Sequence, residues 1–375
     1  MTRILILASF APSLCNFRGA LIEEMCRRGH EVHAAAPGLS ADDTTSNWLG
    51  ERGVTCHDVA LSRSGLNPIA DLKTLGQLVR LMRQIGPDLF IGYTVKPVVW
   101  GLLAARIAKV PRRVALITGL GYAFTGTASG LRRIVRTVAR TLYRSALRHA
   151  TLVFFQNPDD RDEFNRLGLL AKDVPVRLVA GSGVDTEHFA PQPFSKLPMR
   201  FLLIARLLGD KGIREYVVAA RHLRETWPDA EFHLVGGADP SPDGISEDEA
   251  KQWHEAGDVI WHGHLSDVRS AIAQAHVYVL PSYREGTPRT VLEAMSMGRP
   301  IITTDAPGCR QTVVSGDNGF LVPVKDATAL ADAMEHFLSD PALLETMGAR
   351  ARRMSLDVFD VRLVNASMLS EMGLD

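Results

Sequence analysis

The sequence predicts an α/β protein built from two doubly wound domains, each a parallel sheet with helices on both faces. Short apolar runs rich in β-branched residues alternate with longer helical patterns along almost all of the 375 residues. This alternation is typical of parallel sheets that are covered by helices. It is interrupted once, in a Pro-rich stretch from Pro191 to Pro198. The length of the chain also suits two domains better than one.

One series of strands is expected on each side of that stretch. The first covers residues 4–8, 32–36, 89–92, 114–117, 152–155 and 176–179, with helices at 18–28, 72–85 and 98–108. The second covers residues 201–205, 232–235, 259–261, 277–280 and 301–303. We predict a first domain over residues 1–193, a second over 194–355, and a C-terminal helix at 356–375 that packs back on the first. A ligand-binding cleft is expected between the two domains.

The composition indicates a globular protein in a reducing compartment. Hydrophobic residues make up 46% of the chain and charged residues 22%, which carries no signature of disorder. The four cysteines show no paired or metal-type spacing, so free thiols and a cytoplasmic location are expected. No run approaches about 20 uninterrupted apolar residues, so no membrane-spanning helix is predicted. The apolar run at residues 4–8 is too short for a secretory signal and suits a buried strand.

The formal net charge of zero conceals an uneven distribution of charge. Residues 1–190 carry 24 Lys and Arg against 16 Asp and Glu, and the rest of the chain has an equal excess of acids. Between Leu89 and Pro158 there are 11 Lys and Arg and no acidic residue. A block of one sign usually faces something anionic.

Within this block, residues 131–149 have the pattern of an amphipathic helix. Its arginines are Arg132, Arg133, Arg136, Arg140, Arg144 and Arg148. Each basic residue near an anionic lipid surface contributes about 1 kcal/mol, so we expect the helix to hold the protein at a membrane surface. A solvated helix face is the alternative. Nucleic acid is disfavoured as the partner because no binding module or aromatic platform accompanies the arginines.

Common nucleotide-binding and metal-binding patterns are missing. The first strand-to-helix turn has no G-x-G-x-x-G, and no G-x-x-x-x-G-K-[ST] occurs in the chain, which counts against an NAD-dependent dehydrogenase and a P-loop enzyme. His262 and His264 stand two residues apart, but no third ligand has a recognisable spacing, so no metal site is predicted.

The most informative segment, residues 281–293, joins a predicted strand to a predicted helix. Thr287 suits the N-cap of that helix, Pro288 its first position and Gly298 its end. The start of a helix offers backbone N–H groups and a positive dipole end to a phosphate. Glu285 precedes the helix and Glu293 lies inside it, so their carboxylates could accept hydrogen bonds from sugar hydroxyls. A solvated loop acid and an internal structural acid are the alternative interpretation.

A second group of charged residues follows the first strand of the second domain. Arg206 and Lys211 lie in a turn that opens into a helix predicted over residues 213–224. Two cations beside a helix N-terminus can neutralise a diphosphate, both bound and leaving. Such a pair is often only an exposed surface feature. Its position at the carboxyl end of a parallel strand, where open α/β sheets bind ligands, favours the binding role.

These motifs together resemble a known family. Glu285 and Glu293 resemble the E-x7-E motif of the retaining family 4 glycosyltransferases, which have the GT-B fold. Arg206 and Lys211 are similar to the phosphate-binding pair of that family, and residues 181–189 resemble its G-N-G-V-D segment. The resemblance covers essentially the whole chain. Segments 16–18, 62–68, 118–122 and 307–310 resemble the bacterial branch that builds polysaccharides on undecaprenyl diphosphate.

The resemblance implies a role for each residue of the motifs. Glu285 would hold hydroxyls of the donor sugar, and Glu293 would hold the ribose of a UDP-linked donor, whose sugar would be an N-acetylhexosamine. Arg206 and Lys211 would bind the diphosphate in place of a metal ion, so no metal or other cofactor is expected. Further donor contacts would come from the start of the helix: Gly286, Thr287, Pro288, Arg289 and Thr290. The reaction would retain the anomeric configuration.

On the acceptor side the resemblance is less specific. It implies an undecaprenyl-diphosphate-linked glycan as acceptor, at the inner face of the cytoplasmic membrane, near Asn16, Arg18, Thr118 and Gly119. Many relatives carry a His in the region that reads 117–122 here, and this chain has none there. The resemblance therefore assigns no acceptor-side base.

Three other functions are compatible with parts of these observations. A nucleotide-sugar isomerase of the same fold, such as a UDP-N-acetylglucosamine 2-epimerase, would act on the donor alone. A glycosidase would use two carboxylates but would leave Arg206 and Lys211 without a purpose. A binding protein that senses nucleotide sugars would use the same contacts without catalysis.

Overall fold

The computed structural model of the chain describes residues 1–62, 67–119, 131–196, 198–241 and 243–375. These residues form two compact units, one comprising Met1–Ser182 with Asn365–Asp375 and the other Gly183–Val364. The division thus precedes the predicted boundary at residue 193, and the last residues of the chain belong to the first unit.

The Pro-rich stretch lies in the second unit because a buried side chain holds it there. Arg299 is fully buried, and its Nη2 donates to the carbonyl oxygens of Gln192 at 3.0 Å and Pro193 at 3.3 Å. Its guanidinium carbon lies 4.6 Å from the ring centroid of Phe194. Burial lowers the pKa of Arg299 to about 10. The stretch without periodicity at which the sequence analysis places the domain boundary is therefore a packed segment.

The first unit contains a seven-stranded sheet in the order β3-β2-β1-β4-β5-β6-β7. Its strands are β1 (Arg3–Leu7), β2 (Glu31–Ala36), β3 (Thr55–Asp58), β4 (Leu89–Tyr93), β5 (Arg112–Ile117), β6 (Leu152–Phe155) and β7 (Val176–Leu178). All of these pairings are parallel. The chain order reverses between β1 and β4, as in doubly wound sheets.

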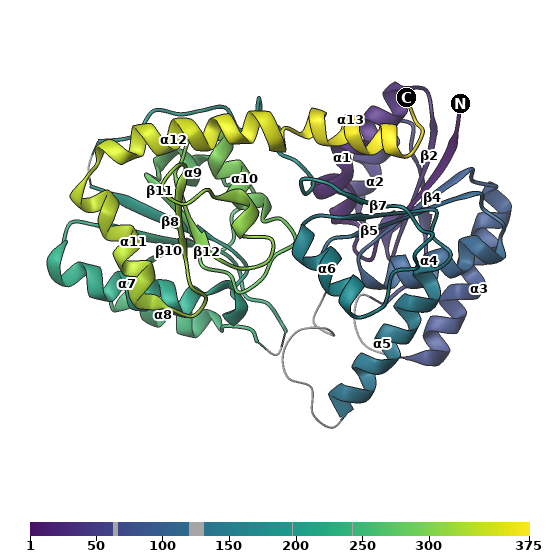
Figure 1. The fold of residues 1–375 in the computed structure, drawn as a ribbon, viewed down its shortest axis with the longest axis horizontal. Helices are drawn as coiled ribbons and strands as arrows, with labels where there is room; N and C mark the ends of the chain where they lie inside the picture. Colours follow the sequence, from purple (N-terminus) through teal and green to yellow (C-terminus); the bar gives the residue numbers. More distant parts are fainter. Residues whose placement is uncertain (63–66, 120–130, 197, 242) are drawn as a thin grey trace. The chain divides into compact units, whose positions relative to one another are not determined.

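Helices cover both faces of this sheet. They are α1 (Pro12–Arg27), α2 (Asp43–Gly50), α3 (Pro68–Ile85), α4 (Val95–Ile107), α5 (Leu131–Leu147), α6 (Pro158–Arg166) and α13 (Val361–Glu371). Figure 1 shows α1, α2 and α13 on one side and α3, α4 and α5 on the other, with α4 between its two neighbours. Asn67 caps α3, and Asn157 caps α6, each by accepting a backbone N–H, with a proline in the first turn.

The second unit repeats this architecture with a six-stranded parallel sheet in the order β10-β9-β8-β11-β12-β13. Its strands are β8 (Arg200–Ile204), β9 (Glu231–Val235), β10 (Ile260–Trp261), β11 (Val277–Leu280), β12 (Ile301–Thr304) and β13 (Gly319–Val322). Its helices are α7 (Ile213–Thr226), α8 (Glu247–Glu255), α9 (Arg269–Gln274), α10 (Arg289–Ser296), α11 (Ala327–Ser339) and α12 (Ala342–Met354). The predicted doubly wound α/β fold is confirmed in both units.

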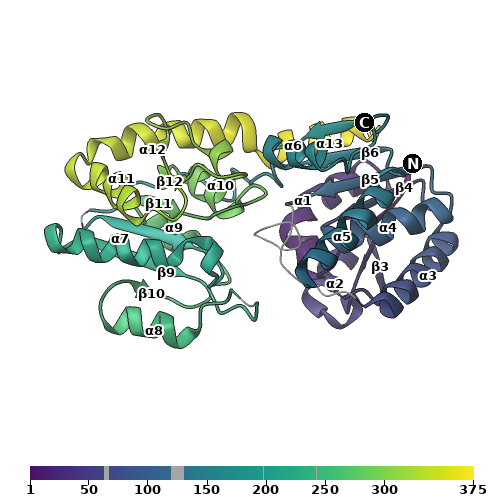
Figure 2. The ribbon, with the colours of Figure 1, turned by 60° about the horizontal axis from the view of Figure 1, so that its bottom comes forward.

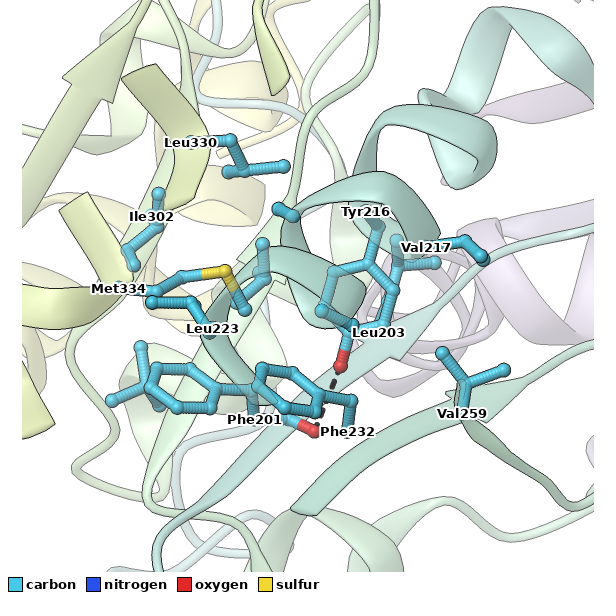
Figure 3. Close-up of a cluster of buried hydrophobic side chains, with 14 of the residues drawn as sticks. Phe201, Leu203, Tyr216, Val217, Leu223, Phe232, Val259, Ile302, Leu330 and Met334 are labelled. Atoms are coloured by element: carbon cyan, nitrogen blue, oxygen red, sulfur yellow. Dashed lines mark hydrogen bonds between the residues drawn. The ribbon is translucent and has the colours of Figure 1, made fainter. Parts of the chain in front are cut away.

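The main core of the second unit lies between its sheet and α7, α8 and α11. Figures 1 and 2 show α7 beside α11 on this side of the sheet. Phe201 and Phe232 stack with their ring centroids 5.4 Å apart, and aliphatic side chains from α7 and α11 surround them (Figure 3). The buried hydroxyl of Tyr216 donates to the carbonyl oxygen of Phe201 at 2.9 Å. The α7 side of the sheet is therefore closed by packing.

Two strands were not predicted, and both are edge strands. β3 reads Thr-Cys-His-Asp and is only partly buried, so it lacks the apolar run by which the other strands are recognised. β13 begins at Gly319 with φ 152°, and a Cβ at this glycine would collide with the carbonyl oxygen of Ile301. Glycine weakens a strand pattern in the sequence, although here it permits the pairing with β12.

A row of hydrogen-bonded charged and histidine side chains occurs at matching places in both units. In the first unit Arg3 pairs with Glu31 at 2.8 Å, and Glu31 accepts from His33 at 2.9 Å. The ring of His33 is hydrogen-bonded to that of His57 at 2.9 Å. The second unit has the same row in Arg200, Glu231, His233 and His262. His262 is thereby placed in a structural network.

Candidate active site

Charged residues meet at the carboxyl edge of the second sheet, at the point where its strand order reverses. That point lies between β8 and β11, which are paired neighbours. In doubly wound sheets, ligands bind outside the carboxyl ends of the strands at this place. The loops that follow β8 and β11 carry Arg206, Lys211 and Glu285.

The loop after β8 is a turn that covers residues 205–212, carries Arg206, and ends in one 3-10 segment, Gly209–Lys211, before α7 begins at Ile213. Gly212 follows this segment in a left-handed conformation with φ 71°, and a Cβ there would collide with the carbonyl oxygen of Pro281. Glycine therefore allows the start of α7 to approach the end of β11 closely. This approach brings Lys211 against the loop that follows β11.

Lys211 and Glu285 form a largely buried ion pair. The Nζ of Lys211 lies 2.6 Å from Oε1 of Glu285, which also accepts from the hydroxyl of Ser282 at 2.8 Å. Burial alone would lower the pKa of Lys211, but the charges of Glu285 and Asp210 outweigh it and raise the pKa above its usual value. Lys211 is thus held as a cation next to a carboxylate.

Several contacts fix the loop that carries Glu285. The backbone N–H of Glu285 donates to the carbonyl oxygen of Pro307 at 2.9 Å. Gly308, with φ 80°, lies so close that a Cβ would collide with the carbonyl oxygen of Glu285. Tyr283 donates its hydroxyl to Glu215 at 2.6 Å, and the Nζ of Lys325 lies 5.0 Å from its ring centroid. Glu285 is therefore held from both sides.

The helix after this loop starts one residue later than predicted. Thr287 was the predicted N-cap, but Pro288 occupies that position, with ψ 109°, and makes no side-chain capping hydrogen bond. This extended ψ means that helical backbone begins only at Arg289. Gly298 follows the helix with φ 78°, as expected of a glycine that ends a helix.

Further hydrogen bonds fix the first turn of α10. The hydroxyl of Thr290 lies 2.6 Å from that of the buried Tyr278, whose hydroxyl also donates to the carbonyl oxygen of Ile204 at 3.1 Å. Burial raises the pKa of Tyr278, so this phenol remains a hydrogen-bond donor. The start of α10 is therefore tied to both central strands.

Glu293 points into the protein from α10. Its side chain is 7% exposed and accepts from Nε of Arg289 at 2.8 Å. Burial raises the pKa of Glu293 in spite of the opposing charge of Arg289. An ionised carboxylate in such a place has an unmet demand for hydrogen-bond donors, which ligand hydroxyl groups can supply.

Arg206 lies at the end of β8 and is paired with another acid. Its Nη1 donates to Oδ2 of Asp239, in the loop after β9. The side chain of Arg206 is 56% exposed and that of Asp239 is 9% exposed. The exposed guanidinium can therefore bind an anion. The sequence pattern did not indicate that Asp239 is its acidic partner.

The four predicted acceptor-side residues lie in the first unit, at two neighbouring strands. Arg18 in α1 is buried, with its guanidinium carbon 5.3 Å from the ring centroid of Tyr93 at the end of β4. Asn16 is exposed on α1, and Thr118 with Gly119 directly follows β5. These residues gather around the carboxyl edge of the sheet.

Sequence reasoning missed a buried ion pair at the same edge. Lys96, in the first turn of α4, has its Nζ 2.9 Å from Asp71 and 2.6 Å from the hydroxyl of Ser62. Lys96 is 9% exposed and Asp71 is 5% exposed. The signal available was a lone lysine within the apolar run that begins α4.

The predicted basic helix is α5, but its first side chains, including those of Arg132 and Arg133, lie outside the described ones. Tyr143 is buried against the core of the first unit. Arg144 and Arg148 are exposed, whereas Arg136 and Arg140 are half-buried. No helix among the described residues is long and apolar enough to cross a bilayer.

An enzyme that transfers a substituent from a diphosphate needs cations and hydrogen-bond acceptors, and the residues around Glu285 supply both. Lys211 and Arg206 are cations, Glu285 and Glu293 are acceptors for hydroxyl groups, and the start of α10 lies beside them. Within the described part of the chain, no group of three or more His, Cys, Asp or Glu side chains could hold a metal ion.

Two family models match the chain, one in each unit. The model described as Glycosyl transferase 4-like domain matches residues 17–181, and the model described as Glycosyl transferases group 1 matches residues 184–354. The two matches meet within a few residues of the division between the units. The second contains all the charged residues described at the edge of β8 and β11.

Similar proteins include several bacterial glycosyltransferases. The chain is 29% identical to the N,N'-diacetylbacillosaminyl-diphospho-undecaprenol alpha-1,3-N-acetylgalactosaminyltransferase of Campylobacter jejuni, over 94% of each chain. It is 26% identical to the UDP-Gal:alpha-D-GlcNAc-diphosphoundecaprenol alpha-1,3-galactosyltransferase of Escherichia coli, over 78% of this chain and 77% of the other.

Solved structures of low sequence identity share the fold. A sucrose-phosphate synthase of Thermosynechococcus elongatus is 22% identical with a TM-score of 0.80, over 99% of this chain and 98% of the other. HepE of Anabaena, solved with UDP and glucose, is 18% identical with a TM-score of 0.78 over the whole of both chains.

Fold and site together define a GT-B enzyme that transfers sugars. The chain belongs to the glycosyltransferases with a 4-like N-terminal domain and a group 1 C-terminal domain.

Proposed function

We propose that this enzyme moves a sugar from a UDP-linked donor to a glycan carried on undecaprenyl diphosphate, with retention of configuration and without a metal ion. The Lys211–Glu285 pair at the reversal of the sheet carries the proposal, since it places a fixed cation beside a fixed acceptor of hydroxyl groups. The relatives from Campylobacter jejuni and Escherichia coli support the acceptor class by their names. The former also supports an N-acetylhexosamine as the sugar.

Each group has a defined task in this reaction. Glu293 binds the ribose hydroxyls, Glu285 binds hydroxyls of the sugar, and Lys211 and Arg206 bind the diphosphate. The acceptor oxygen bonds to the anomeric carbon on the face from which UDP leaves, while the bond from that carbon to the diphosphate oxygen breaks. A diphosphate oxygen takes the proton of the acceptor hydroxyl. The two cations stabilise the charge that develops on the leaving group.

The acceptor is part of a lipid, so the enzyme must work at a membrane surface. The exposed Arg144 and the half-buried Arg136 and Arg140 of α5 supply attraction to anionic headgroups. Two large apolar side chains in the first turn of α3, Ile69 and Leu72, are 70% and 62% exposed. Because α3 and α5 each lead from the carboxyl edge of the same sheet, the first turn of α3 and the half of α5 that carries Arg136 lie at one edge of the unit, whereas Arg144 lies toward the other end of α5. We place the membrane contact along α5 from that edge, on the cytoplasmic side.

A thermal-shift panel of nucleotide sugars followed by a transfer assay tests the proposal. UDP-N-acetylhexosamines should raise the melting temperature, because a ligand that binds only the folded state stabilises it. Sugar should then pass to a polyprenyl-diphosphate-linked acceptor with its anomeric configuration kept. Epimerisation of the UDP-sugar without acceptor would instead establish an isomerase, and hydrolysis of a glycoside without nucleotide a glycosidase.

A further inference from the structure

The loop after β9 closes around the turn that carries Arg206. Its backbone pairs with the turn on both sides, since Leu207 bridges to Ala238 in parallel and Leu208 bridges to Gly244 in antiparallel fashion. Residues 236–241 and 243–245, which we call the β9 loop, therefore form one structural piece with the turn.

The β9 loop directs two carboxylates at the cationic turn. Asp239 accepts from Nη1 of Arg206. Asp243 accepts from the backbone N–H of Asp210 at 2.8 Å, through its side chain. A Cβ at Gly209 would lie 2.7 Å from Oδ1 of Asp243, and a Cβ at Gly244 would collide with the carbonyl oxygen of Asp239. Gly209 permits the close approach of the loop to the turn, and Gly244 permits the loop to fold closely on itself.

The two partners in the Arg206–Asp239 pair are unequally fixed. Asp239 is 9% exposed, and its Oδ1 accepts from the backbone N–H of Ser241 at 2.9 Å. Burial alone would raise the pKa of Asp239, but the bonds from Ser241 and the charge of Arg206 outweigh it and keep the pKa below its usual value. Arg206 is 56% exposed and is held through Nη1. A fixed carboxylate therefore orients a solvent-facing guanidinium.

We propose that Asp239 is a positioning residue, which holds the Arg206 guanidinium so that its remaining N–H donors face the diphosphate of the nucleotide sugar. This inference rests on the proposed function. A guanidinium has five donors in a fixed plane, so one bond to a rigid carboxylate leaves a defined set for the ligand. A free arginine would lose side-chain entropy when it binds the diphosphate, and an oriented one has lost part of it already.

The test is a double-mutant cycle on UDP affinity and on the rate of transfer. Asp239→Asn should weaken UDP binding and slow transfer by roughly tenfold, in the range that coupled neighbours show. The same change in an Arg206→Ala background should have no further effect, because Asp239 acts through Arg206. Asp239→Glu, which keeps the charge, should recover part of the loss.

A matched control exists in the same unit. Asp258 is 12% exposed and pairs at 2.6 Å with Arg221, which is 53% exposed, so Asp258→Asn breaks an equivalent pair on another part of the surface. This control should leave UDP affinity and rate unchanged.

The inference would be overturned by equal losses from Asp239→Asn with and without Arg206, by tighter UDP binding in Asp239→Asn, or by equal losses in the Asp258 control. If the unsubstituted enzyme bound no nucleotide sugar at all, the proposed function itself would fail. If Arg206→Ala bound UDP more weakly while Asp239→Asn bound it as tightly as the unsubstituted enzyme, the proposed function would stand and only this role of Asp239 would be rejected.

Discussion

Nζ of Lys211 lies 2.6 Å from Oε1 of Glu285, across 74 residues of sequence. This contact joins the loops after β8 and β11, the two strands between which the order of the second sheet reverses. The side chains are only 15% and 18% exposed, so removal of one partner leaves a poorly solvated charge. The pair therefore serves both the fold and the proposed chemistry.

Replacement of either partner should separate these two contributions. Lys211→Ala should slow transfer by orders of magnitude, since a cation that stabilises developing charge is worth about 100-fold or more. It should also destabilise the fold by about 3 kcal/mol, because Glu285 is left in a poorly solvated place without its ion-pair partner. Glu285→Ala should chiefly lower turnover. Single-turnover rates and urea unfolding measure the two effects, and Arg350→Ala, at a surface pair with Asp317, should change neither. Full activity in both variants would place the site elsewhere.

Glu293→Gln should weaken nucleotide binding without a loss of stability. The raised pKa of Glu293 means that the fold disfavours its ionised form, so an uncharged amide of similar size removes that cost. A ribose held by a carboxylate should nevertheless bind less well to an amide, by about tenfold for a charge-assisted hydrogen bond. Calorimetric titration with UDP and a melting curve test this pair of expectations. Unchanged affinity would exclude Glu293 from the ribose site.

Transfer should survive removal of divalent metal. Arg206 and Lys211 supply positive charge at the proposed diphosphate site, so EDTA should leave the rate unaltered, whereas Arg206→Ala should lower it strongly. Initial rates with and without EDTA, followed by addition of Mg²⁺ or Mn²⁺, provide the measurement. Loss of activity in EDTA with recovery on adding either ion would contradict the prediction.

The hydrogen-bonded histidine pairs His33–His57 and His233–His262 should make the free energy of unfolding depend on pH. Burial, and then the neighbouring histidine, lower the pKa of His57 and of His262 below the usual 6.5. The unfolded chain therefore binds more protons around that pH, and the free energy of unfolding should fall as pH drops below about 6.5. His57→Gln and His262→Gln should each flatten the curve between pH 7 and 5, about the ordinary range of histidine titration. The same replacement at exposed His222 should not, and equal slopes in all variants would refute the assignment.

Much of the fold and the main elements of the site were predictable, because parallel strands and helices leave strong patterns in a sequence. β6 and β11 were predicted with the bounds that the structure has, since buried strands of parallel sheets read as continuous apolar runs. The loops of Arg206, Lys211 and Glu285 were predictable for the same reason, as each follows such a run.

The contacts among these residues were not predictable from one sequence. The two members of each ion pair lie on different loops or helices, and only the order of strands in the sheet decides which loops meet. The pairs are Lys211 with Glu285, Arg206 with Asp239 and Lys96 with Asp71. The start of α10 was misplaced because a proline after a threonine resembles a cap, whereas the ψ of Pro288 delays the helix. That the Pro-rich stretch packs within the second unit was not predictable either, because its contacts with Arg299 leave no periodic signal.

Binding to lipid vesicles should need anionic headgroups and should weaken as salt rises. Electrostatic attraction of exposed arginines is screened within about 8 Å at physiological salt, and each arginine contributes about 1 kcal/mol near such a surface. Reversal of Arg136, Arg140 and Arg144 to Glu should therefore release the protein from the vesicles while UDP affinity stays unchanged. Replacement of Ile69 and Leu72 by Ser should weaken the binding that remains at high salt, since those two side chains supply apolar area.

A charge-matched control separates the helix from the overall charge of the protein. Arg221, Arg350 and Arg353 are at least half exposed in the second unit, and their reversal to Glu changes the net charge equally. Vesicle sedimentation at several salt concentrations should show release by the α5 changes and retention with the control changes. Equal binding to neutral and anionic vesicles, or equal release by both sets, would show that α5 is a solvated face and that the acceptor is reached by another surface.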